Sequence, residues 1–122
     1  MFFIRSASEA DLPKVSALLG RSWHATYDAL HGAEKVGGIT ASRHSVAALR
    51  ARLKRPDSEF VVADDGDRIG GMAYAAMDRD EADVVVLHQL YVEPDLMGQG
   101  IGRDLFAEVE TCFPAAKRMR LE

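Results

Sequence analysis

The segment that most constrains the fold runs from Leu90 to Arg103 and reads LYVEPDLMGQGIGR. A strand-forming run, Val84 to Val92, leads into it, and Pro94 follows at once. Three glycines then alternate with other residues at positions 98, 100 and 102, and apolar residues recur after them with helical spacing. This order predicts a strand, a tight glycine-rich loop and a helix whose first turn begins at the loop.

Such a loop is suited to binding an anion. The first turn of a helix has several unpaired N–H donors and carries about half a positive charge, which favours phosphate or pyrophosphate. The chain itself has 15 Lys+Arg against 19 Asp+Glu and a formal charge of −4, so an anionic ligand needs a local backbone site. The same balance argues against a nucleic-acid partner. The alternative is that the glycines only form a tight turn and let the helix pack closely on the strand.

The sequence lacks the motifs of several other classes of binding site and of membrane or secreted proteins. The spacing G-x-G-x-G is not the dinucleotide fingerprint, and no G-x-x-x-x-G-K-[ST] phosphate loop occurs. The single cysteine, Cys112, excludes an internal disulfide and a cysteine-cluster zinc site, and no histidine pair has convincing ligand spacing, so we expect no metal. No apolar run approaches the roughly 20 residues that cross a bilayer, and the N-terminus does not resemble a secretory signal. We therefore expect a cytoplasmic protein with no membrane partner.

Hydrophobic periodicity predicts one domain over residues 1–122, because no repeat or linker interrupts the chain. The first strand is expected at residues 2–4, and a helix follows with Leu12, Val15, Leu19 and Trp23 on its apolar face. Residues 28–40 predict a mobile connection, with a second helix capped by Thr40 or Ser42. The remaining elements are a hairpin of residues 59–64 and 68–77, a central strand at 84–92, a helix from 101 and a strand beginning near 117.

These residues resemble the GNAT N-acetyltransferases, a family of acyl-CoA-dependent enzymes. The resemblance covers nearly the whole chain: Ile4-Arg5 with Ser8 and Asp11-Leu12-Pro13 is similar to the family's first strand and helix, and FVVAD followed by RIGGMAY is similar to its hairpin. The most specific match is L-Y-V-x-P followed by G-x-G-I-G. The resemblance implies an α/β (α+β) fold with a mixed, mostly antiparallel sheet flanked by helices, and acetyl-CoA as the acyl donor.

The resemblance also implies which residues bind CoA. Backbone groups of Leu90 and Val92 would bond the pantetheine arm, and backbone N–H groups of the glycine loop would hold the pyrophosphate. The implied set is Leu90, Tyr91, Val92, Met97, Gly98, Gln99, Gly100, Ile101, Gly102 and Arg103. The family usually has Gln or Arg where this chain has Met97, so one side-chain contact to the phosphates is missing. The family also continues with a C-terminal part, a further helix and strands, that this sequence is expected to lack.

Acetyl transfer to a primary amine requires the neutral amine, yet a lysine-like amine has a pKa near 10.4 and is only about one part in a thousand neutral near pH 7.4. A base or an apolar pocket must remove the proton, and a donor must hold the developing oxyanion. The resemblance implies the Val92 N–H as that donor. The candidate catalytic side chains are His88, Tyr91 and Glu93. Strand alternation places His88 with Leu90 and Val92 on one face and Tyr91 on the other. Each has an alternative role. His88 would be a core histidine, Tyr91 would line the acceptor channel, and Glu93 would be a solvated loop residue.

The acceptor side is expected at the end of the first long helix, where aromatic and acidic groups suit an amine through cation–π and charge contacts. The residues are Trp23, His24, Tyr27, Asp28 and His31. Trp23 also continues the apolar stripe of the helix, so a core position is the alternative for it.

The predicted function is transfer of an acetyl group from acetyl-CoA to a primary amine of a small molecule or peptide, by direct attack. Two alternatives remain. One is a non-catalytic acyl-CoA-binding or sensor module. The other is an N-terminal fragment of an acetyltransferase, whose unpaired strand edges would drive association, for example as a homodimer.

Overall fold

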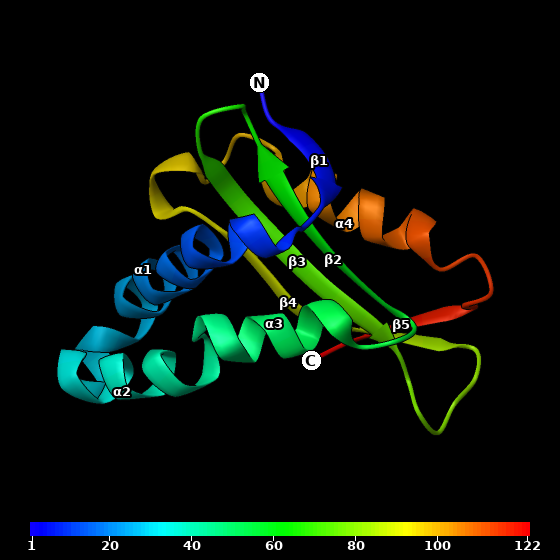
Figure 1. Ribbon diagram of the computed structural model, residues 1–122, viewed down its shortest axis with the longest axis horizontal. Coiled ribbons are helices and arrows are strands. Elements are labelled where there is room, and N and C mark those ends of the chain that lie inside the picture. Colours follow the sequence, from blue (N-terminus) through cyan, green and yellow to red (C-terminus); the bar gives the residue numbers. More distant parts are fainter.

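A computed structural model describes residues 1–122 and contains a five-stranded sheet with helices on both faces (Figure 1). In chain order the elements are β1 (Phe3–Ser6), α1 (Leu12–His31), α2 (Ala33–Arg43), α3 (Val46–Lys54), β2 (Ser58–Asp64), β3 (Ile69–Met77), β4 (Val84–Val92), α4 (Ile101–Cys112) and β5 (Arg118–Leu121), with short 3-10 helices at Glu9–Asp11 and Pro94–Leu96. The strands lie in the order β1-β2-β3-β4-β5, and all neighbours are antiparallel except β4 and β5, which are parallel. The predicted mixed, mostly antiparallel sheet is confirmed.

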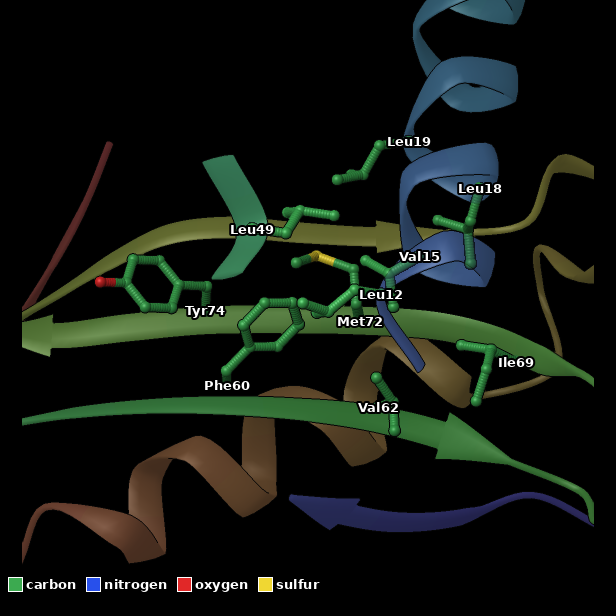
Figure 2. Close-up of a cluster of buried hydrophobic side chains, with 10 residues drawn as sticks. All are labelled: Leu12, Val15, Leu18, Leu19, Leu49, Phe60, Val62, Ile69, Met72 and Tyr74. Carbon is green, nitrogen blue, oxygen red and sulfur yellow. The ribbon is translucent and has the colours of Figure 1, made fainter. Parts of the chain in front are cut away.

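Two apolar clusters hold the helices to the two faces of the sheet. Helices α1 and α3 cover one face through a cluster that Figure 2 shows, made of Leu12, Val15, Leu18, Leu19, Leu49, Phe60, Val62, Ile69, Met72 and Tyr74. Helix α4 covers the other face, where a second cluster contains Val61, Ala63, Ala73, Ala75, Val85, Leu87, Ile101, Leu105 and Val109. No helix combines the length and the apolar character that a membrane span requires.

The centre of the sheet is β3, so the prediction of a central strand at Val84–Val92 is wrong. Eight of the nine residues of β3 are buried, whereas β4 is buried only in its first four residues. The branched residues of β4 favour a strand, but strand propensity does not determine which strand lies in the middle of a sheet. That position follows from the order in which the two hairpins pair.

Residues 28–40, predicted as a mobile connection, are almost entirely helical. Helix α1 continues to His31, Gly32 turns the chain with φ of +84°, and α2 follows with Val36 fully buried. The cap of the next helix is also different from the prediction, because Thr40 lies inside α2 and Ser45 caps α3, its Oγ accepting from the Ala48 N–H. Helix α2 is stabilised by packing against α1 and has only a weak apolar pattern of its own. The sequence pattern therefore did not predict it.

Candidate functional site

The glycine loop forms a hollow at the start of α4. Gly98 and Gly100 have φ of +84° and +85°, a region that residues with a Cβ rarely adopt, and Gly100 immediately precedes the first helical residue, Ile101. The hollow encloses about 340 Å3 and is lined by Leu90, Val92, Leu96, Met97, Gly98, Gly100, Ile101, Gly102 and Arg103. Among the residues predicted to bind CoA, only Tyr91 and Gln99 do not line this glycine-loop hollow.

Gly102 has a different role from the two glycines before it. A Cβ at this position would lie 3.6 Å from both Leu90 Cδ2 and Val92 Cγ2, which is ordinary contact distance. Helix α4 therefore approaches the end of β4 closely at Gly102. Gly98 and Gly100 therefore shape the turn and Gly102 lies where α4 packs on β4, which are the structural roles considered above as the alternative to anion binding.

A β-bulge in β4 changes the face to which His88 belongs. Tyr74 of β3 pairs with Gln89, but the next residue, Ala75, pairs with Leu87, so His88 is an extra residue in the ladder. Such an insertion shifts the alternation of side chains by one position. The His88 ring stacks on Tyr74 with ring centroids 5.6 Å apart. The prediction that His88 shares a face with Leu90 and Val92 is therefore wrong; His88 lies on the side of Tyr91.

Next to the bulge lies a larger cavity of about 450 Å3, called here the polar cavity. Its lining residues are Trp23, Arg43, His44, Ala51, Arg52, Arg55, Tyr74, His88, Gln89, Tyr91 and Glu122. The indole Nε1 of Trp23 donates to the Tyr91 hydroxyl at 3.2 Å, and Nδ1 of His88 lies 3.1 Å from Glu122 Oε1. Two of the three candidate catalytic side chains, His88 and Tyr91, thus face one cavity.

A groove of about 290 Å3 between α1 and β4 adjoins both hollows. It shares Leu90, Val92 and Met97 with the glycine-loop hollow and shares Tyr91 with the polar cavity. On the α1 side its lining residues are small: Ser22, Ala25 and Thr26. The three hollows therefore lie next to one another along β4, and Tyr91 lines both the groove and the polar cavity.

His44, which lines the polar cavity, has an unusually low pKa. The residue is 3% exposed, and its ring lies 5.4 Å from the ring of Trp23. Burial, together with the positive charges of Arg52 and Arg43, lowers the pKa of His44 to about 4. His44 is therefore uncharged at neutral pH.

This shift predicts a loss of stability in mild acid. The unfolded chain binds a proton at His44 below the ordinary pKa of 6.5, whereas the folded chain does so only near 4. The contribution of neutral His44 is present above pH 6.5 and is lost as the pH falls from 6.5 towards 4, by about 2 to 3 kcal/mol. Urea unfolding of wild type and His44→Gln between pH 7 and 4 measures it. The variant should lose less stability over this range, and parallel curves would contradict the prediction.

The structure separates Glu93 from His88 and Tyr91. Its carboxylate is 6% exposed and accepts from Arg21 at 2.7 to 3.1 Å and from Arg68 at 3.4 Å. These hydrogen bonds raise the pKa of Arg21. The Glu93 N–H also donates to the Gly70 carbonyl at 2.9 Å. Glu93 thus ties the loop after β4 to α1 and β3, a contact between residues 72 apart that the sequence alone does not indicate.

Removing the Arg21 guanidinium should show how much the Arg21–Glu93 pair contributes to the free energy of unfolding. In Arg21→Met the buried Glu93 carboxylate retains only the longer bond to Arg68, so we expect the free energy of unfolding to fall by about 1 to 3 kcal/mol. Arg50→Met is the matched control, because Arg50 and Glu9 form an exposed pair that should contribute under about 1 kcal/mol. Urea denaturation compares the two variants, and equal losses would contradict a special role of the Glu93 pair.

Of the five residues expected on the acceptor side, only Trp23 lines the polar cavity. Tyr27 packs on the Trp23 ring with centroids 4.7 Å apart, and His31 lies beyond Tyr27. His24 and Asp28 pair with each other at 2.7 Å. The residues that sequence reasoning missed are Arg43, His44, Arg52 and Arg55, from the end of α2 and from α3 and its C-terminal end. Arg52 lies in the last turn of α3 and Arg55 just after its end, so no helical spacing in the sequence links them.

A family model described as "Acetyltransferase (GNAT) domain" matches residues 28–121. None of the curated proteins matches the chain. Among solved structures, the PaiA N-acetyltransferase of Thermoplasma acidophilum in complex with coenzyme A is similar, with 23% identity, a TM-score of 0.83, and coverage of 92% of this chain and 71% of that one.

Two further structures are similar in fold. A transcriptional regulator from Bacillus halodurans C-125 is 20% identical with a TM-score of 0.73, over 100% of this chain and 81% of that one. An aminoglycoside acetyltransferase from an uncultured soil metagenomic sample, in complex with sisomicin, is 18% identical with a TM-score of 0.69, over 99% of this chain and 76% of that one. These identities establish a shared fold.

Proposed function

Because the chain belongs to the GNAT acetyltransferase family, we propose that it transfers an acetyl group from acetyl-CoA to a primary amine by direct attack. The observation that carries the proposal is the row of adjoining hollows along β4, from the glycine loop at the start of α4 to a cavity lined by a histidine and a tyrosine. This arrangement provides separate places for a phosphate-bearing donor and for an acceptor. The transferred group would pass near Tyr91, where the groove meets the polar cavity.

The glycine-loop hollow has the features that a pyrophosphate requires. The turn at Gly98 and Gly100 directs the chain into the first turn of α4, whose N–H groups are the natural donors to an anion. The Arg103 guanidinium is 83% exposed at the rim, with only a 3.8 Å contact to Asp104, and offers a positive charge beside the loop. The groove between α1 and Leu90–Val92 then suits the extended pantetheine arm, because small side chains line its α1 side.

We assign His88 as the base and Tyr91 as the proton donor. Because Nδ1 of His88 faces Glu122, its Nε2 is left to accept a proton from the amine. The Tyr91 oxygen already accepts from Trp23, which stabilises negative charge on that oxygen once its proton is given away. Glu93 has no part in this scheme because its carboxylate is engaged by two arginines.

In the proposed step the amine nitrogen attacks the thioester carbonyl carbon, forming the N–C bond, while the C–S bond breaks and its electron pair goes to sulfur. The amine proton passes to His88. The Tyr91 hydroxyl protonates the leaving thiolate, and Tyr91 regains a proton from solvent. The backbone N–H of Val92 is the proposed donor to the carbonyl oxygen as negative charge develops there.

A direct assay tests the function. The full chain is mixed with acetyl-CoA and a panel of primary amines, free thiol is measured, and mass spectrometry identifies the acetylated amine. Thiol release that depends on the amine supports the proposal. Calorimetric binding of acetyl-CoA without turnover on any amine would instead support the acyl-CoA-binding module, and no binding by a folded sample would overturn the assignment of the glycine loop.

Tyr91→Phe tests the proton donor. We expect kcat to fall by about tenfold, a modest loss because a thiol with an ordinary pKa near 8.5 leaves readily as a thiolate even without protonation. Tyr27→Phe is the control, because its hydroxyl makes no hydrogen bond within the protein and lies outside the polar cavity. Steady-state kinetics with the best amine compares them. Equal kcat in wild type and Tyr91→Phe would limit Tyr91 to lining the channel.

A further inference from the structure

The polar cavity is unusually rich in positive charge for a chain with a net charge of −4. Three guanidinium groups line it, from Arg43, Arg52 and Arg55, against the single carboxylate of Glu122. That carboxylate faces His88 rather than an arginine. The local balance of charge in the cavity is therefore opposite to that of the whole protein.

The three arginines also lack the partners that other arginines have. Each of the others forms an ion pair with a carboxylate, except the exposed Arg79, which lies away from the cavity. Acidic residues outnumber basic ones in this chain, so partners are not scarce. Around this cavity, three arginines therefore have no carboxylate partner, although Arg52 donates one hydrogen bond to the Arg43 carbonyl at 2.9 Å.

Unsatisfied polar atoms point in the same direction. Arg52 Nη1, Tyr74 Oη and Gln89 Oε1 are buried and have no hydrogen-bond partner, and all three residues line the cavity. Figure 2 shows the Tyr74 hydroxyl directed away from the apolar cluster to which its ring belongs. Buried polar groups are normally paired, so these atoms mark where a polar ligand would bind. A guanidinium can only donate, so the ligand group that faces Arg52 must be an acceptor.

We propose that the acceptor amine carries an anionic group, a carboxylate or a phosphate, which Arg52 binds with Arg43 and Arg55. The planar guanidinium matches both anions through paired N–H donors. The amine end of the same molecule then lies towards His88 and Tyr91 on the β4 side of the cavity. This inference rests on the proposed function, and it names the class of substrate: amino acids or aminoalkyl phosphates rather than amines without negative charge.

The same charges assist the chemistry. A positive environment disfavours the ammonium form of a bound amine and lowers its pKa. His44 shows this effect in part, since its pKa is lowered chiefly by burial and also by the charges of Arg52 and Arg43. The arginines thus attract the anionic end of the acceptor and favour the neutral, reactive form of its amine.

Matched pairs of acceptors test the inference. The first pair is β-alanine and β-alaninamide, the second is phosphoethanolamine and ethanolamine, and 1,4-diaminobutane supplies a dication. Trp23 is the only tryptophan and lines the cavity, so its fluorescence reports binding without any turnover. We expect the anionic member of at least one pair to bind about tenfold tighter than its neutral partner, and the diamine to bind weakest. The better pair distinguishes carboxylate from phosphate.

Single arginine variants test which side chain gives the preference for the anionic amine. Arg52→Gln should reduce the preference for the anionic member by about tenfold, while Arg79→Gln, which removes an equally unpaired but distant arginine, should leave it unchanged. Circular dichroism checks folding, and the exposed Arg43→Gln provides the test if Arg52→Gln does not fold. Anionic binding with no thiol release would retain the inference about the ligand and reject acetyl transfer. Equal binding within both pairs, or no binding of any anionic amine, would overturn the inference.

Discussion

Replacing Gly100 with valine is expected to lower the affinity for CoA at least about a hundredfold while the chain still folds. Gly100 has φ of +85°, where a β-branched residue is strongly disfavoured, and its Cβ would lie 2.9 Å from Arg103 Nη2. The backbone must rotate to relieve this strain, and the N–H groups at the start of α4 then no longer converge on a phosphate. Calorimetric titration with CoA measures the affinity.

Gly66→Val is the matched control for this experiment. Gly66 lies in the turn between β2 and β3 with φ of +100°, and no atom lies within 4 Å of its ideal Cβ position. Both variants should lose about 1 to 3 kcal/mol of stability from backbone strain, but only Gly100→Val should lose CoA binding. A Gly100→Val protein that binds CoA as well as wild type would show that the glycine loop does not hold the pyrophosphate.

His88→Gln is expected to lower kcat/KM near neutral pH by about 10² to 10⁴, the range that general acid–base catalysis supplies. Glutamine keeps a polar side chain of similar reach but cannot take up the amine proton. The affinity for CoA should be unchanged, because His88 does not line the glycine-loop hollow. We expect the pH–rate profile of wild type to depend on an ionising base and that of the variant to lose this dependence.

The control for this variant is His31→Gln, an exposed histidine on α1 outside the polar cavity. It should leave both kcat/KM and the pH profile unaltered. A His88→Gln enzyme with the rate and profile of wild type would remove His88 as the base. The amine would then depend on the positive field of the arginines, or on water, for its deprotonation.

Local patterns predicted the elements that are proposed to bind the acyl donor. The hairpin of β2 and β3, the strand β4 and the helix α4 follow from side-chain alternation and helical spacing within each segment. The turn before α4 was equally predictable from the sequence, since the glycines at positions 98 and 100 adopt a positive φ that other residues rarely adopt. These features depend on neighbours a few residues apart, so the sequence contains them in full.

The acceptor side was less predictable because it depends on distant pairings. The face of His88 depends on a bulge, which exists only because β3 pairs with β4 on either side of it. The environment of Glu93 depends on Arg21, and the polar cavity brings α1, α3 and β4 together around arginines at positions 43, 52 and 55. Reasoning from the sequence therefore chose Trp23 and Tyr91 but missed the charges around them.

The sequence by itself determined the family and the glycine loop that joins β4 to α4, because periodicity and positive φ are properties of short segments. Only the tertiary structure decided that His88 and Tyr91 face one cavity, that Glu93 is held elsewhere, and that the cavity carries an excess of positive charge. Each of these depends on which residues meet across strands and helices far apart in the chain. Such contacts arise from packing of the whole fold and leave no signal at fixed spacing in the sequence.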